Sequence, residues 1–353
     1  DAGVVRRRLD ELAVLSEVWI AGVRVFEAAV DVCAPVARVV DRLASSSPDR
    51  EAVVVVTHGA EVAVAGAVAR CRLDRAGTWA PAVALATGVP AVELDDRERL
   101  GSWVRATAGF RDEFYALVPF VRDLLEPGDP PSRPDVPPEL PSNHAALVTA
   151  GLIEPARVLW GASTTRFAGQ RLLAPVIDLE ALRERAASPD GDRRLAVWAD
   201  ARLRPKLVVA TQTRTVEAAV DDVGWWWPSV PVISVLVDPE HDTSEGRWLV
   251  AAALMAPPVT AWAAERSAGT ALARHALKLP ARQLLEVPLP VDADAWAEGA
   301  RLLQGVAGAD DEDRPALLAA AGRVLTAAHA LPAGDDERVL RWWAARAGCG
   351  ADI

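Results

Sequence analysis

The chain has 353 residues, of which 51% are hydrophobic and 25% charged, so it is long enough to bury a large core and to form two domains or more. This is the composition of an ordinary soluble globular protein. The formal net charge of −11 argues against a protein that coats nucleic acid nonspecifically, because neutralising many phosphates requires clustered Lys and Arg side chains.

The first hundred residues have the pattern of an incomplete sheet. Apolar residues recur at helical spacing over residues 5–12, and β-like runs follow at 15–20 and 30–40. We therefore predict a helix and two strands there, and a further strand in the apolar run at 52–56. Residues 1–100 are predicted to be an α/β fragment that cannot close a core alone.

Residues 101–290 have the pattern of an α+β domain. The stretch 126–141 contains seven prolines, which exclude a regular helix or a central strand and predict an exposed loop. β-like runs at 206–210 and 231–237 predict two strands, separated by a turn at Gly224-Trp225-Trp226-Trp227-Pro228.

Helices dominate the C-terminal part of the chain, and residues 291–353 are predicted to be a helical tail. An earlier helix begins at about Glu245 and is interrupted by Pro257-Pro258. Asp313 and Asp335 stand at positions typical of helix starts. The helices predicted in the tail cover 294–306, 313–330 and 335–346.

No arrangement typical of catalysis or metal binding occurs in the sequence. It contains no Gly-rich phosphate loop, no His/Cys metal spacing and no nucleophile elbow. Cys33, Cys71 and Cys349 are far apart and odd in number, which indicates a reducing, cytoplasmic setting. The apolar stretches at 52–71 and 248–264 are too interrupted for a membrane span. We expect neither a catalytic residue nor a metal site in this chain.

Cations gather in three windows that contain no Asp or Glu, at 155–177, 201–216 and 266–285. If folding brings the windows together, an acidic protein can still present a basic cleft to a polyanion, although such windows also arise by chance. Only two of the 38 cations are lysines, and both lie in short β-like runs inside these windows. The candidate contacts to a nucleic-acid backbone are Arg166, Arg204, Lys206, Arg214, Lys278 and Arg282, and Thr211, Gln212 and Thr213 are candidates for polar readout.

Several segments together resemble the C-terminal part of adenine-specific DNA methyltransferases of the restriction and phage-defence type. Residues 4–40, with Val18-Trp19-Ile20, resemble the end of the catalytic domain, which is the last part of a Rossmann-like sheet. Further segments resemble the entry, the central strands, the "lysine strand" and the closing motif of the target-recognition domain. They are Gly109 to Tyr115, Val148 to Ile153, Arg204 to Arg214, Leu277-Lys278-Leu279-Pro280 and Val287-Pro288-Leu289-Pro290.

The resemblance implies an S-adenosylmethionine-dependent enzyme that flips an adenine out of double-stranded DNA and methylates its exocyclic amine. In that family the cofactor motif and an Asn-Pro-Pro-aromatic tetrad lie upstream of these segments, and this chain contains neither. Its Asp129-Pro130-Pro131-Ser132 lies in the proline-rich loop. We therefore expect a chain that binds DNA, binds no cofactor itself, transfers no methyl group alone and works with a separate N-terminal catalytic half. Phe110 and Tyr115 are candidates for base stacking, or else for the core.

Two other functions fit the same sequence. The chain could be a noncatalytic interaction subunit of a defence complex, whose tail docks a partner through Trp296, Trp342 and Trp343. It could also be part of a methyltransferase that acts on RNA or on a small molecule.

Overall fold

The computed structural model describes residues 4–5, 8, 12–21, 33–39, 51–57, 68–72, 80–109, 111–126, 128–132, 138–189, 191, 193–268 and 276–349. It is a mixed α/β structure with several separate sheets. The chain divides into two compact units, one of Asp1–Glu93 with Ala261–Lys278 and the other of Leu94–Thr260 with Leu279–Ile353. No helix in the described part of the chain combines the length and the apolarity that crossing a bilayer requires.

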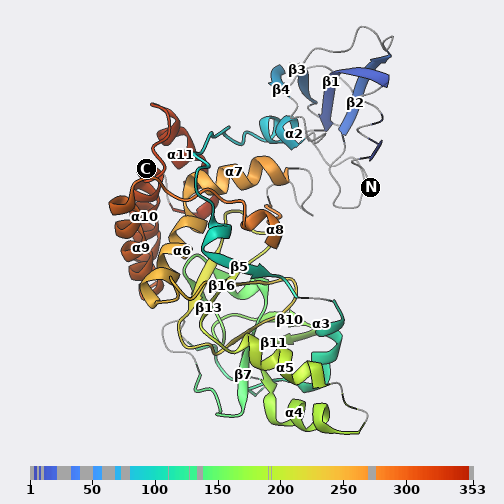
Figure 1. Ribbon diagram of the computed structural model, residues 1–353, viewed down its shortest axis with the longest axis vertical. Coiled ribbons are helices and arrows are strands. Elements are labelled where there is room, and N and C mark those ends of the chain that lie inside the picture. The colour runs from blue at the N-terminus through green and yellow to red at the C-terminus, as the bar shows by residue number, and fades with distance from the viewer. Residues whose placement is uncertain are drawn as a thin grey trace. The chain divides into compact units, whose positions relative to one another are not determined.

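The first unit contains a four-stranded sheet in the order β2-β1-β3-β4 (Figure 1). β1 pairs antiparallel with β2 and parallel with β3, and β3 pairs antiparallel with β4. The strands predicted at 15–20, 30–40 and 52–56 are confirmed where the structure describes them. The helix α2 packs near β1, β3 and β4 and was not predicted, because it is short and Gly and Pro flank it. The elements are β1 (Ala13–Ala21), β2 (Cys33–Val39), β3 (Glu51–Thr57), β4 (Val68–Arg72) and α2 (Ala80–Ala86).

The second unit contains two four-stranded sheets and two small hairpins. One sheet has the order β15-β7-β12-β6 and consists of β6 (Val121–Asp123), β7 (His144–Val148), β12 (Pro175–Asp178) and β15 (Trp226–Pro228). The other has the order β14-β13-β16-β5 and consists of β5 (Val104–Thr107), β13 (Lys206–Val209), β14 (Ala218–Asp221) and β16 (Ile233–Val237). The hairpins are β8 (Ile153–Glu154) with β9 (Arg157–Val158), and β10 (Thr165–Phe167) with β11 (Gln170–Leu172).

Helices complete the second unit, and those predicted after residue 244 are confirmed. Residues 261–267 of α7 (Pro257–Ser267) belong to the first unit. α6 and α7 are separate because Pro257 opens α7, and Asp292 caps α9 by accepting hydrogen bonds from two backbone amides. α9 packs along α10 and α6 (Figure 1). The longer helices are α6 (Ser244–Met255), α7 (Pro257–Ser267), α9 (Ala293–Ala307), α10 (Arg314–Ala327) and α11 (Asp335–Ala347). The short ones are η1 (Leu100–Ser102), α3 (Arg111–Leu117), η2 (Val118–Phe120), η3 (Ala150–Leu152), α4 (Leu179–Ala187), α5 (Arg193–Arg202) and α8 (Ala281–Leu284).

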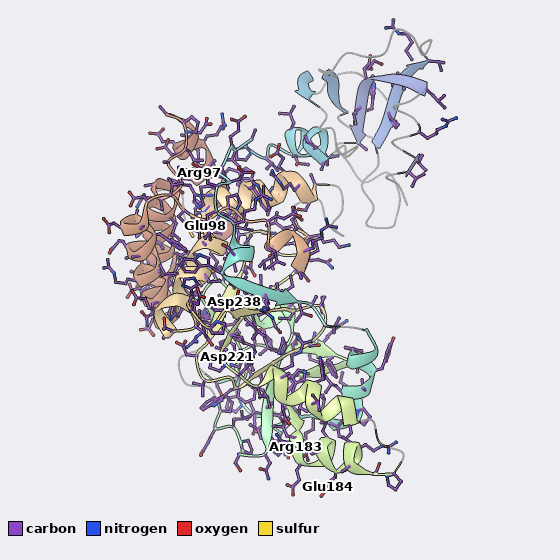
Figure 2. The ribbon with its side chains drawn as sticks, viewed as in Figure 1. Arg97, Glu98, Arg183, Glu184, Asp221 and Asp238 are labelled. Atoms are coloured by element: carbon purple, nitrogen blue, oxygen red, sulfur yellow. The ribbon has the colours of Figure 1, made fainter. Side chains whose placement is uncertain are left out.

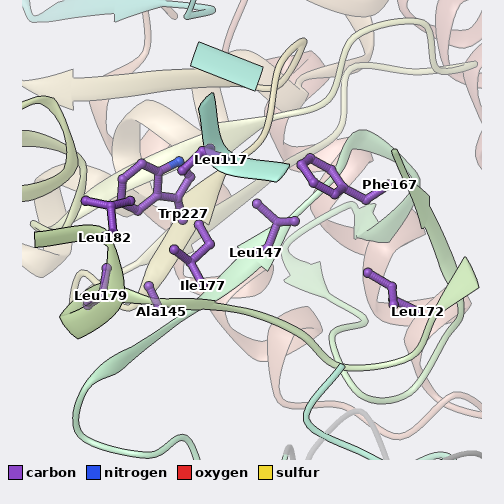
Figure 3. Packing of buried hydrophobic residues seen from close by; sticks show 9 residues of the cluster. All are labelled: Leu117, Ala145, Leu147, Phe167, Leu172, Ile177, Leu179, Leu182 and Trp227. Atoms are coloured by element: carbon purple, nitrogen blue, oxygen red, sulfur yellow. The ribbon is translucent and has the colours of Figure 1, made fainter. Parts of the chain in front are cut away.

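A hydrophobic core lies beside the sheet that contains β7 and β12 (Figure 3). Leu147 and Ile177 come from these two strands, and Trp227 comes from β15 at the edge. Phe167 and Leu172 join the same core from the β10–β11 hairpin. One face of that hairpin is therefore fixed to the body of the unit.

Two predicted local structures are wrong. Trp226–Pro228 is not a turn but the strand β15, which pairs parallel with β7. The run around Lys278 forms no strand: its residues alternate in burial, but Pro280 carries no N–H for a ladder hydrogen bond. Residues 211–214 lie in the turn between β13 and β14, where Gln212 has a left-handed backbone (φ 68°).

Candidate nucleic-acid interface

The structure separates the cations of the acid-free windows into exposed and buried groups. Arg202 and Lys206 are buried, and Arg202 donates a hydrogen bond to the Ser234 hydroxyl (3.1 Å). Arg157 is largely buried, with 14% of its side chain exposed, and pairs with Glu154 and Asp311. Arg274 lies outside the described residues. The exposed cations are Arg166, Arg171, Arg204, Arg214, Arg266, Lys278 and Arg282.

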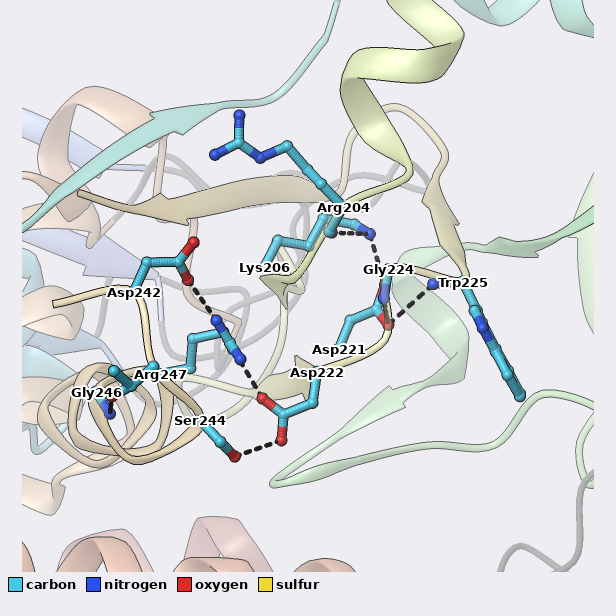
Figure 4. Close-up of polar contacts among 11 residues, drawn as sticks. Arg204, Lys206, Asp221, Asp222, Gly224, Trp225, Asp242, Ser244, Gly246 and Arg247 are labelled. Atoms are coloured by element: carbon cyan, nitrogen blue, oxygen red, sulfur yellow. Dashed lines mark hydrogen bonds and ion pairs between the residues drawn. The ribbon is translucent and has the colours of Figure 1, made fainter. Parts of the chain in front are cut away.

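Lys206 is a structural residue and not an exposed cation. Its side chain is 0% exposed, and its Nζ lies 2.6 Å from Oδ2 of Asp221 (Figure 4). Burial lowers the pKa of Lys206, and the charge of Asp221 opposes that shift. The predicted contact between Lys206 and a nucleic-acid backbone is therefore corrected to a buried ion pair. The sequence contained a signal for this, since an all-apolar strand is typical of burial on both faces and a cation there needs a carboxylate.

Asp221 links the buried pair to an exposed turn. Its two carboxylate oxygens accept hydrogen bonds from the backbone amides of Gly224 (2.8 Å), Trp225 (3.0 Å) and Trp226 (2.9 Å). Gly224 has φ +85°, and a Cβ there would lie 2.7 Å from the backbone of Arg204. The Lys206–Asp221 pair therefore fixes the connection between β14 and β15, while the Arg204 side chain points away from it (Figure 4).

The β10–β11 hairpin brings two exposed arginines together. Arg166 and Arg171 are directly opposite each other across the two strands. Thr165, Phe167 and Leu172 are buried on the other face. Cross-strand neighbours of like charge destabilise a sheet, so this arrangement needs an explanation beyond folding.

Several exposed arginines elsewhere in the second unit pair with nearby carboxylates, although Arg122 and Arg185 bond His144 and Ser188 instead. Such pairs include Arg97 with Asp95, Arg99 with Asp96, Arg183 with Asp200 and Arg301 with Glu298. Arg183 lies on α4, beside Glu184 in the chain (Figure 2). By contrast, no carboxylate among the described residues lies within ion-pair distance of Arg166, Arg171, Arg204 or Arg214.

The predicted polar residues of 211–214 divide between inward and outward positions. The Thr211 hydroxyl is buried and has no hydrogen-bond partner among the described residues. Thr213 donates its hydroxyl hydrogen bond to the carbonyl of Thr215. Gln212 and Arg214 are exposed, and the charge of Arg214 adds to burial in lowering the pKa of Arg346. Gln212 and Arg214 therefore remain available to a ligand.

The remaining predicted site residues lie on other elements. Lys278 is exposed and belongs to the first unit, whereas Lys206 belongs to the second. Arg282, on α8, is exposed, and its Nε lies 3.9 Å from Oε1 of Glu286. Tyr115, on α3, is 55% exposed and meets the Phe114 ring edge-on. Phe110 lies outside the described residues.

Folding changes the protonation of the Glu217 carboxyl group. Burial raises its pKa to about 7, and the charge of Glu154 adds to that rise. Because the pKa in the folded state lies above the ordinary value of 4.5, the associated stability is complete below about pH 4.5 and is lost as the pH rises through about 7. Folding therefore disfavours the ionised form of this side chain.

We expect Glu217→Gln to stabilise the protein at pH 8, by up to ~3 kcal/mol, and to change its stability little at pH 5. Urea unfolding at both pH values measures the difference. Glu184→Gln, an exposed change on α4, is the control and should have little effect at either pH. An equal effect of Glu217→Gln at pH 5 and pH 8 would contradict the raised pKa.

Comparisons with known proteins do not assign the chain to a family. No protein-family model matches the chain, and no curated protein matches it. Within the described ranges, no group of three or more His, Cys, Asp or Glu side chains is placed to hold a metal ion.

Proposed function

We propose that this chain is the DNA-binding, target-recognition part of an adenine-specific, S-adenosylmethionine-dependent DNA methyltransferase. The observation that carries the proposal is the contrast among the exposed arginines. Four arginines of the acid-free windows, Arg166, Arg171, Arg204 and Arg214, lack carboxylate partners among the described residues. Arg266 and Arg282 of the same windows are paired, as are Arg97, Arg99, Arg183 and Arg301 elsewhere. In a protein of net charge −11, unneutralised guanidinium groups favour a polyanionic ligand.

The proposed roles follow from the chemistry of the exposed side chains. Guanidinium groups bind phosphate oxygens in a bidentate manner, which positions a duplex without reading its sequence. Gln212 carries an amide that can both donate to and accept from a base edge, so it is the proposed polar readout residue in the β13–β14 turn. Arg204 and Arg214 lie before and after β13, so they would contact separate stretches of the DNA backbone.

S-adenosylmethionine would supply the methyl group in the intact enzyme. Among the described residues, no strand is followed by a Gly-rich turn of the kind that cradles such a cofactor, so the described part of the chain does not fit it. We therefore assign to this chain only the binding and orienting of DNA. No step of methyl transfer is derived from it.

The direct test is binding of the whole chain to a double-stranded oligonucleotide over a series of salt concentrations. If four guanidinium groups each neutralise one phosphate, the plot of log K against log salt has a slope of roughly −3 to −4. Fluorescence anisotropy measures this slope. A chain that does not bind the duplex, or binds with a slope near zero, would refute the proposal. Tighter binding to an RNA duplex would favour the RNA alternative.

The interaction-subunit alternative depended on the tryptophans of the helical tail. Trp296 is buried and donates its Nε1 hydrogen bond to the carbonyl of Leu249 (2.8 Å). Trp343 is buried against Gly322, and Trp342 lies under the Arg346 guanidinium (4.3 Å). These rings pack within their own unit, so no observation favours them as a docking surface.

A further inference from the structure

We propose that the β10–β11 hairpin is a phosphate clamp, in which Arg166 and Arg171 together bind the backbone of duplex DNA. This inference rests on the proposed function and assigns one part of it to a defined element. The two arginines are cross-strand partners on the exposed face of the hairpin.

The buried face of the hairpin is anchored, which fixes the backbone positions of the two arginines. Phe167 and Leu172 are part of the hydrophobic core on the buried face (Figure 3). The Thr165 hydroxyl is hydrogen-bonded to the Thr149 hydroxyl. A ligand that meets the exposed face therefore meets two guanidinium groups on a support that is already ordered.

The turn of the hairpin keeps the two strands in register. Ala168 (φ 48°) and Gly169 (φ 83°) both have left-handed backbones between the paired residues Phe167 and Gln170. This two-residue loop matches the right-handed twist of the flanking strands. In this register Arg166 lies opposite Arg171, and both side chains are on the exposed face. A shift of one strand by one residue would turn one of the two arginines toward the core.

Repulsion between the two guanidinium groups is not relieved within the described part of the protein. No acidic residue there pairs with Arg166 or Arg171, and 155–177 contains neither Asp nor Glu. Phosphates relieve the repulsion, because each guanidinium fork matches the geometry of two phosphate oxygens. Double-stranded DNA is the favoured partner, because its two strands carry one charge per about 1.7 Å of helix axis, so a second phosphate is always close to the first.

The test compares two double variants of the whole chain that remove the same charge. Arg166→Ala with Arg171→Ala removes the clamp, and Arg183→Ala with Arg185→Ala removes two exposed arginines from α4. On one DNA duplex, we expect the clamp variant to reduce the slope of log K against log salt by roughly 2 in magnitude. We expect the α4 variant to leave the slope unchanged. Arg166→Lys with Arg171→Lys should retain most of the slope, because the charges remain.

A single charge reversal separates binding from folding. Arg171→Glu places a carboxylate opposite Arg166, so the hairpin gains an attractive cross-strand pair. The thermal midpoint should stay the same or rise, whereas DNA affinity should fall at least tenfold at 100 mM salt. This combination cannot come from unfolding.

The outcomes distinguish the two proposals. If the unmodified chain does not bind DNA, the proposed function fails. If it binds, but the clamp and α4 variants have equal slopes, the clamp is refuted and the proposed function stands. The assignment to DNA is wrong if two results occur together: the unmodified chain binds an RNA duplex more tightly than DNA, and the clamp variant binds that RNA duplex more weakly.

Discussion

Replacing Lys206 with Met should lower the free energy of unfolding by roughly 3–5 kcal/mol, because it leaves the carboxylate of Asp221 buried without its cation. The two side chains are 0% and 3% exposed. The backbone amides of Gly224, Trp225 and Trp226 remain as donors to Asp221, but neutral donors do not cancel its charge. Urea unfolding monitored by circular dichroism measures the loss.

The only other lysine of the chain provides the matched control. Lys278→Met makes the same chemical change at an exposed position and should alter stability by no more than about 0.5 kcal/mol. A double-mutant cycle of Lys206→Met with Asp221→Asn should give a coupling energy of about 1 kcal/mol or more, because the two groups are in contact. Equal effects of the two Lys→Met variants would contradict the buried pair.

Replacing Trp227 with Ala should cost roughly 3–5 kcal/mol of stability, because it removes a large side chain from a close-packed core. Trp227 is 0% exposed and lies in the hydrophobic core (Figure 3). It packs edge-on against Trp198, with ring centroids 4.8 Å apart. Its Nε1 has no hydrogen-bond partner among the described residues, so the loss comes from packing and not from a broken hydrogen bond. The thermal midpoint and the urea midpoint should both fall.

Trp225→Ala is the control for this change, two residues earlier in the same run. Trp225 is 55% exposed, and its amide, not its ring, forms the hydrogen bond to Asp221. We expect a change in stability within about 0.5 kcal/mol. A loss as large as that of Trp227→Ala would show that the outer ring also belongs to a core.

The helices of the C-terminal part were predictable because their signals are local. Asp292, Pro315 and Gly348 mark the start of α9, the first turn of α10 and the end of α11, and each acts through neighbouring backbone groups. The strands β13 and β16 were likewise predictable from β-like runs. The short strand β15 was not, because its pairing with β7 joins residues about eighty positions apart.

The candidate site was only partly predictable. The acid-free windows indicated where cations would lack neighbouring acids along the chain, and for Arg166, Arg204 and Arg214 the described structure keeps that property. Lys206 is different because β14 brings Asp221, fifteen residues away, into contact with it. The partner of Arg166 across the hairpin, Arg171, became evident only from the strand register.

The sequence by itself determined the mixed α/β character, the positions of the helical segments and the windows in which cations are not neutralised by adjacent residues. These features depend on propensity, capping and charge within a few residues. The tertiary structure alone decided which tryptophan of the run Trp225-Trp226-Trp227 is fully buried, which lysine is neutralised and which arginines stand opposite each other. Those outcomes depend on strand pairing between distant segments, because burial and ion pairing are set by what the fold places beside each side chain.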